Sequence, residues 1–431
     1  MTDTTLKPGL YYGWYVVAAC LFIALVTVGA RQAFGVFVIP MSEEFGWDRT
    51  TISLALALGV LVNGLTQPFM GYLFDRSGVR VILASLIVVG LTTVSLAATF
   101  HILFLAFTFG VVASVGLSGA SSINTKALLA KWFLRRRGTV IGLNGAGSSL
   151  GGLVLVPFAA YLMEATSWRV SWVALGLIIL VLSVPLAFMF LRDDPGAMGL
   201  GPDGDPGPRQ DGATGPGYQA LGLLETDRWT RAFRSLPIWQ ISSSYFVCGC
   251  TTMVISFHFV AYAEEEAGAS PIMAAWAFSF MMLLNVVGAI GAGVLGDRYS
   301  RKNVLATAYL LRGCAYVVLL TTPSTAGLWA FATLAGVSWV ATAAVTSALT
   351  ADVYGVRALG TIAGISFGFH QLGGSLSVLL AGVLNDVTGS YTLPFAIVGS
   401  LLFLAALSAF TVKERKYSMR YRVQSAPAAG G

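Results

Sequence analysis

Long apolar segments separated by short polar ones fill almost the whole chain. They lie near residues 12–39, 51–73, 80–98, 102–125, 138–162 and 170–191, and, after a polar stretch, near 238–262, 272–295, 303–322, 326–351, 358–385 and 391–412. A membrane-spanning helix needs about 20 mostly apolar residues. Backbone in lipid must satisfy its own hydrogen bonds, and the alternation of a transmembrane barrel is absent. The pattern therefore predicts an all-α membrane protein with twelve transmembrane helices.

Composition agrees with this prediction. Hydrophobic residues make up 56% of the 431 residues and charged residues 11%, whereas a soluble protein has about 25% charged residues. The four cysteines lie in apolar segments, and Cys248 and Cys250 lack the spacing of a zinc site. The glycine runs lie inside spans, and no P-loop is present. We therefore expect neither a soluble enzyme nor a metal or cofactor.

The basic residues indicate the orientation in the membrane, because short loops rich in Lys and Arg stay in the cytoplasm. With the N-terminus inside, the cytoplasmic loops hold Arg76, Arg80, Lys126, Lys131, Arg135, Arg136, Arg137, Arg298, Arg301 and Lys302, and the tail adds five more bases. The outer loops then carry mainly acids. We predict a multi-pass protein of the inner (plasma) membrane with both termini cytoplasmic. The net charge of +6 thus needs no nucleic-acid partner to explain it.

The polar stretch in the middle divides the chain. The predicted units are an N-terminal six-helix bundle (1–191), a cytoplasmic central loop (192–237), a C-terminal six-helix bundle (238–413) and a cytoplasmic tail (414–431). Within the loop, Leu221, Leu224, Trp229, Phe233 and Leu236 fall near one helical face. This spacing predicts a short interfacial helix over 219–236, with an ordinary polar loop as the alternative.

The two halves repeat one motif. Gly71-Tyr-Leu-Phe-Asp75-Arg76-Ser-Gly78-Val-Arg80 follows the second span, and Gly293-Val-Leu-Gly-Asp297-Arg298-Tyr-Ser-Arg301-Lys302 follows the eighth. The glycines let backbones approach closely, and each Asp could pair with a base or a helix N-terminus. Our hypothesis is that these residues form a conformational switch that holds the halves together in one state. The alternative is a charge cluster that only sets topology.

This repeated motif resembles the cytoplasmic loop signature of the major facilitator superfamily. The stretch Trp132-Phe133-Leu-Arg135-Arg136-Arg137 through Ala146-Gly147-Ser148 to Gly151 resembles the signature of the monocarboxylate porters, with Asn144 in place of an Ala. Of the first-span signature of these porters, only Gly13 and Trp14 remain. The resemblance implies two pseudo-symmetric six-helix bundles and a bacterial-type relative of those porters.

Few ionisable residues lie deep in the predicted spans. They are Arg31, Arg312, His258 and His370, the last followed by Gln371, and no Asp or Glu lies at the middle of a span. Such residues mark functional sites by default. A substrate carboxylate is the natural partner for Arg31, although the guanidinium could instead reach outward or bind backbone carbonyls. Arg312 has the same two interpretations. Either histidine could carry a proton or simply pack.

The resemblance adds two positions to the candidate substrate site. In the monocarboxylate porters an Asp and an Arg lie four residues apart on the eighth span, and these positions align with Asn285 and Ala289. A functional Lys late in the first span aligns with Gln32. We infer that the substrate-binding cation has moved to Arg31. Asn285 could still donate a hydrogen bond to a carboxylate or hold two helices together, and Asn144 could line the cavity.

These observations predict a monomeric secondary transporter of a small organic anion, a monocarboxylate, that works by alternating access with proton symport. The runner-up is exchange of one organic anion for another, which needs no proton carrier. A non-transporting membrane sensor and a drug exporter are further alternatives. A sensor is expected to have a large soluble domain, and a drug exporter a central carboxylate. Neither feature is visible in the sequence.

Overall fold

The computed structural model describes residues 10–47, 49–205 and 223–421. Within these ranges the chain forms helices and no β-strand. The first half contains α1 (Gly13–Gln32), α2 (Phe34–Phe45), α3 (Arg49–Ser77), α4 (Val79–Ser95), η1 (Leu96–Ala98), α5 (Ile102–Leu105), η2 (Ala106–Ala113), α6 (Ser114–Gly119), α7 (Ser122–Trp132), α8 (Arg137–Ala165), α9 (Trp168–Leu177), η3 (Ile178–Ser183), α10 (Val184–Phe190), η4 (Pro195–Met198) and η5 (Pro202–Gly204). The second half contains α11 (Trp229–Ala232), α12 (Leu236–Glu265), α13 (Pro271–Arg298), α14 (Arg301–Thr321), α15 (Thr325–Tyr354), α16 (Leu359–Thr388), α17 (Thr392–Thr411), α18 (Glu414–Tyr417) and η6 (Met419–Tyr421).

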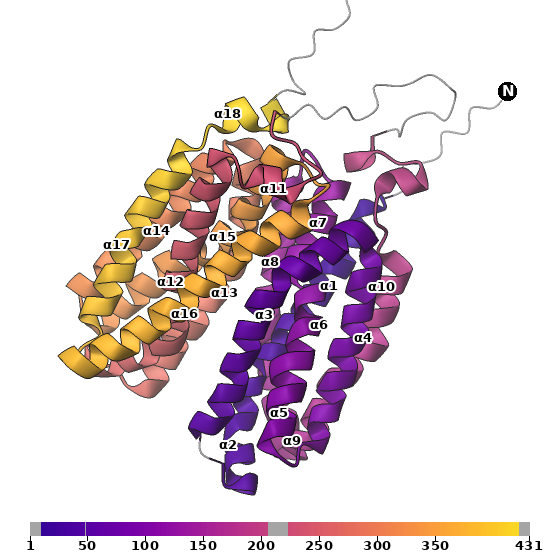
Figure 1. Ribbon diagram of the computed structural model, residues 1–431. Coiled ribbons are helices and arrows are strands. Elements are labelled where there is room, and N and C mark those ends of the chain that lie inside the picture. The colour runs from indigo at the N-terminus through magenta and orange to yellow at the C-terminus, as the bar shows by residue number, and fades with distance from the viewer. Residues whose placement is uncertain (1–9, 48, 206–222, 422–431) are drawn as a thin grey trace, which may run out of the picture.

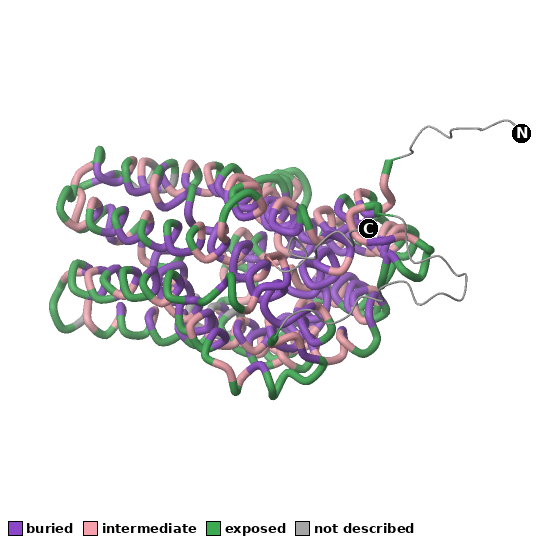
Figure 2. Tube along the Cα trace, turned by 90° about the horizontal axis from the view of Figure 1, so that it is seen from above, coloured by how far each residue is buried: buried purple, intermediate pink, exposed green. Residues whose placement is uncertain are grey.

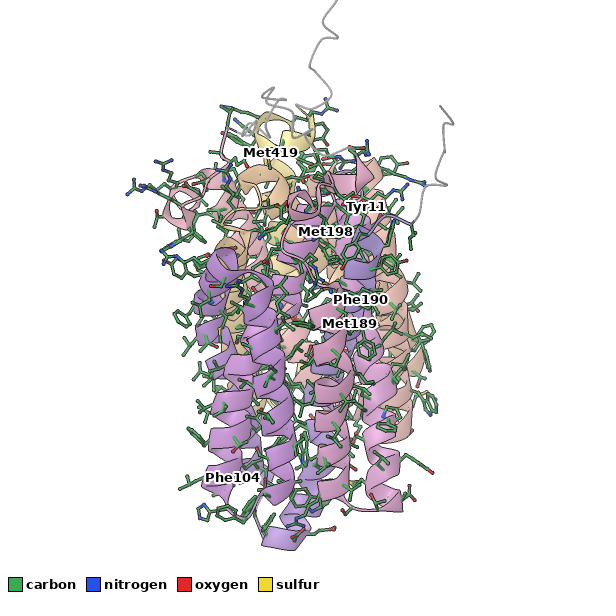
Figure 3. The ribbon with its side chains drawn as sticks, turned by 90° about the vertical axis from the view of Figure 1, so that its right-hand side faces the viewer. Tyr11, Phe104, Met189, Phe190, Met198 and Met419 are labelled. Carbon is green, nitrogen blue, oxygen red and sulfur yellow. The ribbon has the colours of Figure 1, made fainter. Side chains whose placement is uncertain are left out.

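The helices gather into two bundles, α1–α10 and α12–α17, which lean together at one end and diverge toward the other (Figure 1). The described chain begins and ends where the bundles meet, and we call this the termini end. Tyr11, Met198 and Met419 lie there, whereas Phe104 lies near the opposite end (Figure 3). Across the boundary α8 packs against α13, and α3 packs against α16. Contact between the bundles therefore involves two related helix pairs.

Eleven segments of the described chain are helical, long and apolar enough to cross a membrane. The predicted second span corresponds to the 29-residue helix α3. Figure 2 shows buried and exposed residues alternating along the helices on the outside of the molecule. Many exposed side chains are large and apolar, among them Leu65, Phe188 and Leu379. Lipid tails solvate such side chains, so this outer surface fits a multi-pass membrane protein.

Each bundle has its own apolar core. Phe34 and Trp172 belong to the N-terminal core, and Tyr316 and Phe331 belong to the C-terminal core. The N-terminal core continues into Ala348 of α15, which belongs to the other bundle. The N-terminal core thus extends across the boundary to the other bundle.

The sequence placed the end of the fourth span near residue 125 and assigned Lys126 and Lys131 to a loop. This boundary is wrong, because α7 continues to Trp132. Ser121 caps the start of α7 by accepting a hydrogen bond from Asn124 N–H (3.3 Å), and most of the helix is buried. Lys126 is therefore part of a buried helix and only 5% exposed.

The helix predicted over 219–236 differs from the structure in its described part, since residues 219–222 lie outside the described ranges. Only the four residues of α11 form a helix before α12 begins at Leu236. Thr226 N–H bonds to the Tyr354 carbonyl (3.2 Å), and Leu224 and Phe233 pack against the C-terminal core. Leu224 and Phe233 thus contact protein, whereas Trp229 and Leu236 are exposed.

Candidate functional site

Asp297 joins the bundles at the termini end. Its carboxylate accepts hydrogen bonds from Gly138 N–H (2.7 Å), Thr139 N–H (2.7 Å) and the Thr139 hydroxyl (2.7 Å), all at the start of α8. A carboxylate at a helix N-terminus satisfies free N–H groups and interacts favourably with the helix dipole. Asp297 therefore caps a helix of the opposite bundle.

Asp75 makes the matching contact in the other half of the chain. It accepts hydrogen bonds from Gly360 N–H (2.8 Å), Thr361 N–H (2.7 Å) and the Thr361 hydroxyl (2.6 Å), at the start of α16. Gly71 lies against the Gly360 carbonyl with no room for a Cβ, and Gly293 lies in the same way against Gly138. The repeated motif thus brings each Asp to a helix N-terminus of the other bundle.

A buried chain of charges extends from the Asp297 contact. Arg137 Nη1 of α8 lies 2.6 Å from Asp352 Oδ1 of α15, and both side chains are almost fully buried. Arg301 pairs with Asp352 on its other side and with Asp297 (2.8 Å). The basic residues Arg137 and Arg301, which the sequence assigned to cytoplasmic loops, are therefore internal partners of carboxylates.

The other residues of the repeated motif lie outside the contact between the bundles. Arg76, Arg80 and Arg298 are exposed, and Arg76 lies over the Tyr72 ring, 4.5 Å from its centroid. Gly78 has φ +59°, and the next N–H, that of Val79, donates to Asp193 (2.6 Å). Arg76 also lines a cavity of about 300 Å³ with Asp75 at the termini end.

The hydrogen bonds between described residues of the two bundles lie between the termini end and the middle of the helices. Among hydrogen bonds between described residues of the two bundles, the one farthest from the termini end joins Asn285 Nδ2 to Ser149 Oγ (3.2 Å). On the other helix pair, Gly64 lies against Gln371. The two bundles thus meet at the termini end, and their ribbons diverge toward the opposite end (Figure 1).

Outside the membrane spans, Glu44 lies in the last turn of α2 at the opposite end. Its carboxylate accepts from Arg169 Nη2 (2.6 Å) and Trp168 Nε1 (2.7 Å), which tie it to α9. Hydrogen bonding to the Arg169 guanidinium holds the pKa of Glu44 below its usual value. This pair lies within the N-terminal bundle and does not join the two bundles.

Asn285 and Arg312 both support the backbone of α15. Asn285 Oδ1 accepts from Val340 N–H (2.7 Å). Arg312 Nη2 donates to the carbonyls of Ser338 (2.6 Å) and Trp339 (2.7 Å). Arg312 is fully buried. It lies inside the C-terminal bundle, and none of its polar partners among the described residues is an Asp or Glu.

The two histidines have different surroundings. His370 is buried, with Nδ1 3.2 Å from Gln371 Oε1 and Nε2 3.5 Å from Thr252 Oγ1. His258 is half-buried and packs on Tyr391, with 5.3 Å between ring centroids. Its Nε2 has no hydrogen-bond partner among the described residues. Gln371 lies against Gly64 of the other bundle, whereas the His370 ring contacts α12 within its own bundle.

Arg31 points into the N-terminal bundle. It lines a small internal cavity with Thr93, Phe109 and Trp172, and none of the described residues is hydrogen-bonded or ion-paired to its guanidinium. Gln32 is exposed, with its amide over Gly152 of α8. The structure therefore places the two neighbours on different sides of α1.

Asn144 holds three helices of the N-terminal bundle together. Its amide donates to the Cys20 carbonyl (3.0 Å), and its oxygen accepts from the Thr125 hydroxyl (3.2 Å). It is fully buried. These contacts link α1, α7 and α8 and use the amide for packing.

Sequence reasoning missed Lys126. Its helix, α7, packs against α15 and α16 of the other bundle, and its ammonium interacts electrostatically with Cys248 of α12. No hydrogen bond or ion pair joins this ammonium to the described part of the chain. The signal was available, because apolar residues continue for several positions beyond Lys126 toward Trp132. Lys126 is thus a buried cation between the bundles without an acidic partner.

Comparison with known proteins agrees with this architecture. The sequence profile of the Major Facilitator Superfamily matches residues 20–266 and 241–427. An uncharacterized MFS-type transporter of Bacillus subtilis (strain 168), YcxA, is 25% identical over 409 residues, which cover 91% of this chain and 93% of the relative. Monocarboxylate transporter 12 of Rattus norvegicus is 27% identical over 427 residues, covering 93% of this chain and 85% of the relative.

Two solved structures share the fold. The proton:xylose symporter XylE aligns with a TM-score of 0.74 at 14% identity, covering 96% of this chain and 98% of its own. The Escherichia coli fucose:proton symporter FucP aligns with a TM-score of 0.65 at 16% identity, covering 92% and 99%. The superfamily profile, which matches most of the chain, shows that the chain belongs to the major facilitator superfamily and, like the sequence relatives, is a multi-pass membrane transporter and not an enzyme.

Proposed function

We propose that this transporter carries a small organic anion, a monocarboxylate, together with a proton by alternating access. The observation that carries this proposal is Lys126, a cation buried between the bundles that has no ion pair with a described residue. A buried ammonium is costly unless an anion accompanies it. A substrate carboxylate would supply that anion. The names of the monocarboxylate transporter relatives support the same substrate class.

Arg31 stays in the proposal as a second cation. Like Lys126, it has no acidic partner among the described residues. Unlike Lys126, it faces the interior of its own bundle. Lys126 is better placed to meet a substrate, because alternating access brings the substrate between the bundles. We therefore propose Lys126 as the first anchor of the carboxylate and Arg31 as a cation that adds to the positive potential of the site.

The sidedness of the membrane follows from the basic loops, which we place in the cytoplasm by the positive-inside rule. The termini end is then cytoplasmic, and the described conformation is closed to the cytoplasm. Asp75 and Asp297, each capping a helix of the other bundle, would hold this outward-facing state. Reopening toward the cytoplasm requires that both caps break, which gives the repeated motif its role as a switch.

Binding by the purified protein tests the proposal. Acetate, lactate, pyruvate, benzoate and succinate are compared with neutral alcohols and amides of the same size by thermal stabilisation. We expect one or more monocarboxylates to raise the unfolding temperature and their neutral analogues to have little effect. Stabilisation by organic cations alone would instead favour a drug exporter. A response to neutral sugars alone would reject an anion substrate.

The second candidate is exchange of two organic anions. The absence of an acidic residue from the middle of every predicted span favours it, because that is where a proton carrier often lies. Symport predicts that uptake into liposomes rises with an inward proton gradient. Exchange predicts uptake that ignores pH and requires an anion inside.

A further inference from the structure

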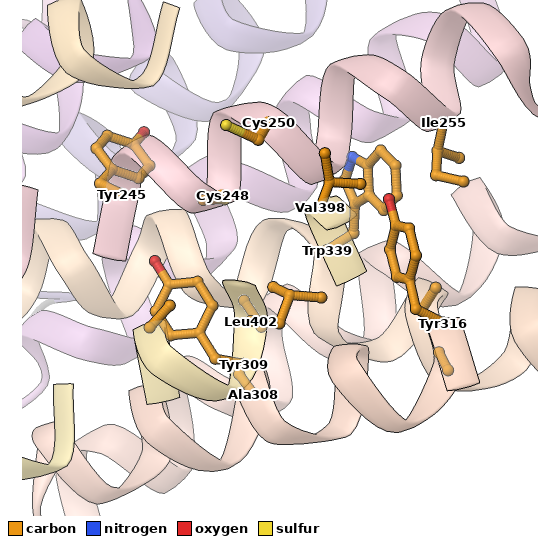
Figure 4. Packing of buried hydrophobic residues seen from close by; sticks show 14 of the residues in the cluster. Tyr245, Cys248, Cys250, Ile255, Ala308, Tyr309, Tyr316, Trp339, Val398 and Leu402 are labelled. Carbon is orange, nitrogen blue, oxygen red and sulfur yellow. The ribbon is translucent and has the colours of Figure 1, made fainter. Parts of the chain in front are cut away.

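Cys248 is one of the buried residues of the C-terminal core (Figure 4), and polar side chains of other helices reach its thiol. Its Sγ lies 3.2 Å from Thr342 Oγ1 and accepts a hydrogen bond from Arg312 Nη1 (3.4 Å). The imidazole of His370 also interacts with the thiol. Three helices besides its own, α14, α15 and α16, thus bring a polar group to one buried sulfur atom.

The titratable groups around this sulfur are bases, tyrosines and a second cysteine. The titratable side chains that interact with Cys248 are Tyr245 and Cys250 on α12, Tyr309, Arg312 and Tyr316 on α14, His370 on α16 and Lys126 on α7. None of them is an Asp or Glu. The described part of the neighbouring helix α15 has one buried carboxylate, that of Asp352. It is paired with Arg137 and Arg301 at the termini end.

Arg312 and Lys126 therefore share one group that can become an anion, the thiol of Cys248. The other partners of Arg312 are carbonyls and hydroxyls, and its Nε has no described partner. A guanidinium stays protonated even when buried. A thiolate is favoured next to cations. A thiolate at Cys248 would therefore neutralise two cations, Arg312 and Lys126.

Building on the proposed function, we propose that Cys248 is the site of the coupled proton. In the empty transporter its thiolate is the counter-anion of Arg312 and Lys126. When a substrate carboxylate binds at Lys126, it takes over part of this role. The second negative charge then favours protonation of the sulfur, because nearby like charges disfavour ionisation.

The step balances without any change of oxidation state. One proton from the outward-facing side adds to the thiolate and forms an S–H bond, and one carboxylate enters with it. His370 is placed to relay the proton, since Nδ1–H donates to Gln371 Oε1 and Nε2, beside the Thr252 hydroxyl, is then unprotonated and can act as a base. Release of both ligands on the other side regenerates the thiolate. Each cycle thus moves one anion and one proton.

The experiment measures proton uptake on substrate binding by the purified full-length protein in a weak buffer with a pH indicator. The probe is whichever of acetate, lactate, pyruvate and benzoate most raises the unfolding temperature. We expect about one proton taken up per bound anion in the wild type, as linkage requires when binding protonates one group. Cys248→Ser should still bind the anion but take up few protons. The exposed Cys314 gives the matched control, Cys314→Ser, which should behave like the wild type.

Ultraviolet thiolate absorbance of the wild type tests the same idea without a variant. We expect a thiolate signal near neutral pH that disappears on acidification and decreases when the anion binds. Wild-type protein without a thiolate signal, or equal proton uptake by Cys248→Ser and Cys314→Ser, would overturn the proposal. If no carboxylate binds at all, the proposed function fails, and the thiolate signal alone then decides the state of Cys248.

Discussion

Asp297 and Thr139 lie 158 residues apart in the sequence, and two hydrogen bonds of 2.7 Å join them, from the Thr139 N–H and hydroxyl to one carboxylate oxygen. Asp75 and Thr361 repeat this geometry between the other helix pair. The duplicated motif therefore appears as a duplicated contact. Each half of the chain supplies one Asp and receives one, so the two bundles close symmetrically at the termini end.

Replacing these carboxylates should weaken the closed state. In Asp75→Asn and Asp297→Asn an amide NH₂ replaces one carboxylate oxygen. Because this NH₂ faces N–H donors, it cannot accept their hydrogen bonds, and each lost charge-assisted hydrogen bond is worth about 1.5–3 kcal/mol. We expect transport to slow at least tenfold, whereas substrate affinity from the open side changes only a few-fold. Uptake and binding by the purified variants measure both. Asp205→Asn, at an exposed pair with Arg135, is the control. Full activity in both test variants would remove the switch role.

Much of the fold is predictable from the sequence, because hydropathy alone locates apolar helices. Eleven of the predicted spans correspond to described helical segments that meet the criteria for crossing a membrane. The boundary at Lys126 is not predictable in this way, since hydropathy does not register that a lysine is covered by another bundle. The repeated motif predicts that Asp75 pairs with a base or with a helix N-terminus. Nothing local identifies that partner as Thr361, 286 residues away.

The candidate site is harder to predict for a related reason. Arg312 and Asn285 are polar residues at membrane depth, and the sequence does not distinguish a ligand-binding group from one that bonds to a neighbouring helix. In the structure both contact the backbone of α15. Asn144 is likewise used within its bundle. The sequence indicates a loop position for Lys126, because this residue stands near other bases.

Asp352 should be critical for stability. It neutralises the buried cations Arg137 and Arg301, and removing one partner of a buried ion pair costs about 3–5 kcal/mol. We expect Asp352→Asn to lower the unfolding temperature in detergent markedly. Glu44→Gln, which removes the half-exposed pair with Arg169, should cost no more than about 1 kcal/mol. Similar unfolding temperatures for the two variants would contradict the buried-charge interpretation.

Proton coupling should depend on His370 more than on His258. His370 interacts with the Cys248 thiol, whereas His258 packs on Tyr391. We expect uptake by wild type and His258→Gln to rise with an inward proton gradient, and His370→Gln to lose most of this response. The measurement is initial uptake into liposomes at fixed internal pH. If His370→Gln responds like the wild type, the proton does not pass through this imidazole.

Arg31 should affect anion binding without being needed for folding. An arginine at membrane depth costs about 2.5–3.5 kcal/mol on insertion scales, and no described acid offsets that cost. We expect Arg31→Gln to fold as well as the wild type and to show less stabilisation by the transported anion. Arg31→Lys keeps the charge without the planar fork and should retain weak activity. Thermal stabilisation by the anion distinguishes the three proteins, and an unchanged response in Arg31→Gln would exclude Arg31 from the site.

The central claim, that Lys126 anchors a small carboxylate between the bundles, is tested most directly by uptake of a radiolabelled monocarboxylate into liposomes. Wild type and Lys126→Gln are compared at equal protein density under the same inward proton gradient. Gln fills similar space but carries no charge. We predict saturable uptake by the wild type and at least a tenfold loss in Lys126→Gln, equivalent to about 1.4 kcal/mol or more of lost stabilisation, with unfolding temperatures that agree. Uptake by Lys126→Gln at the wild-type rate would contradict the account.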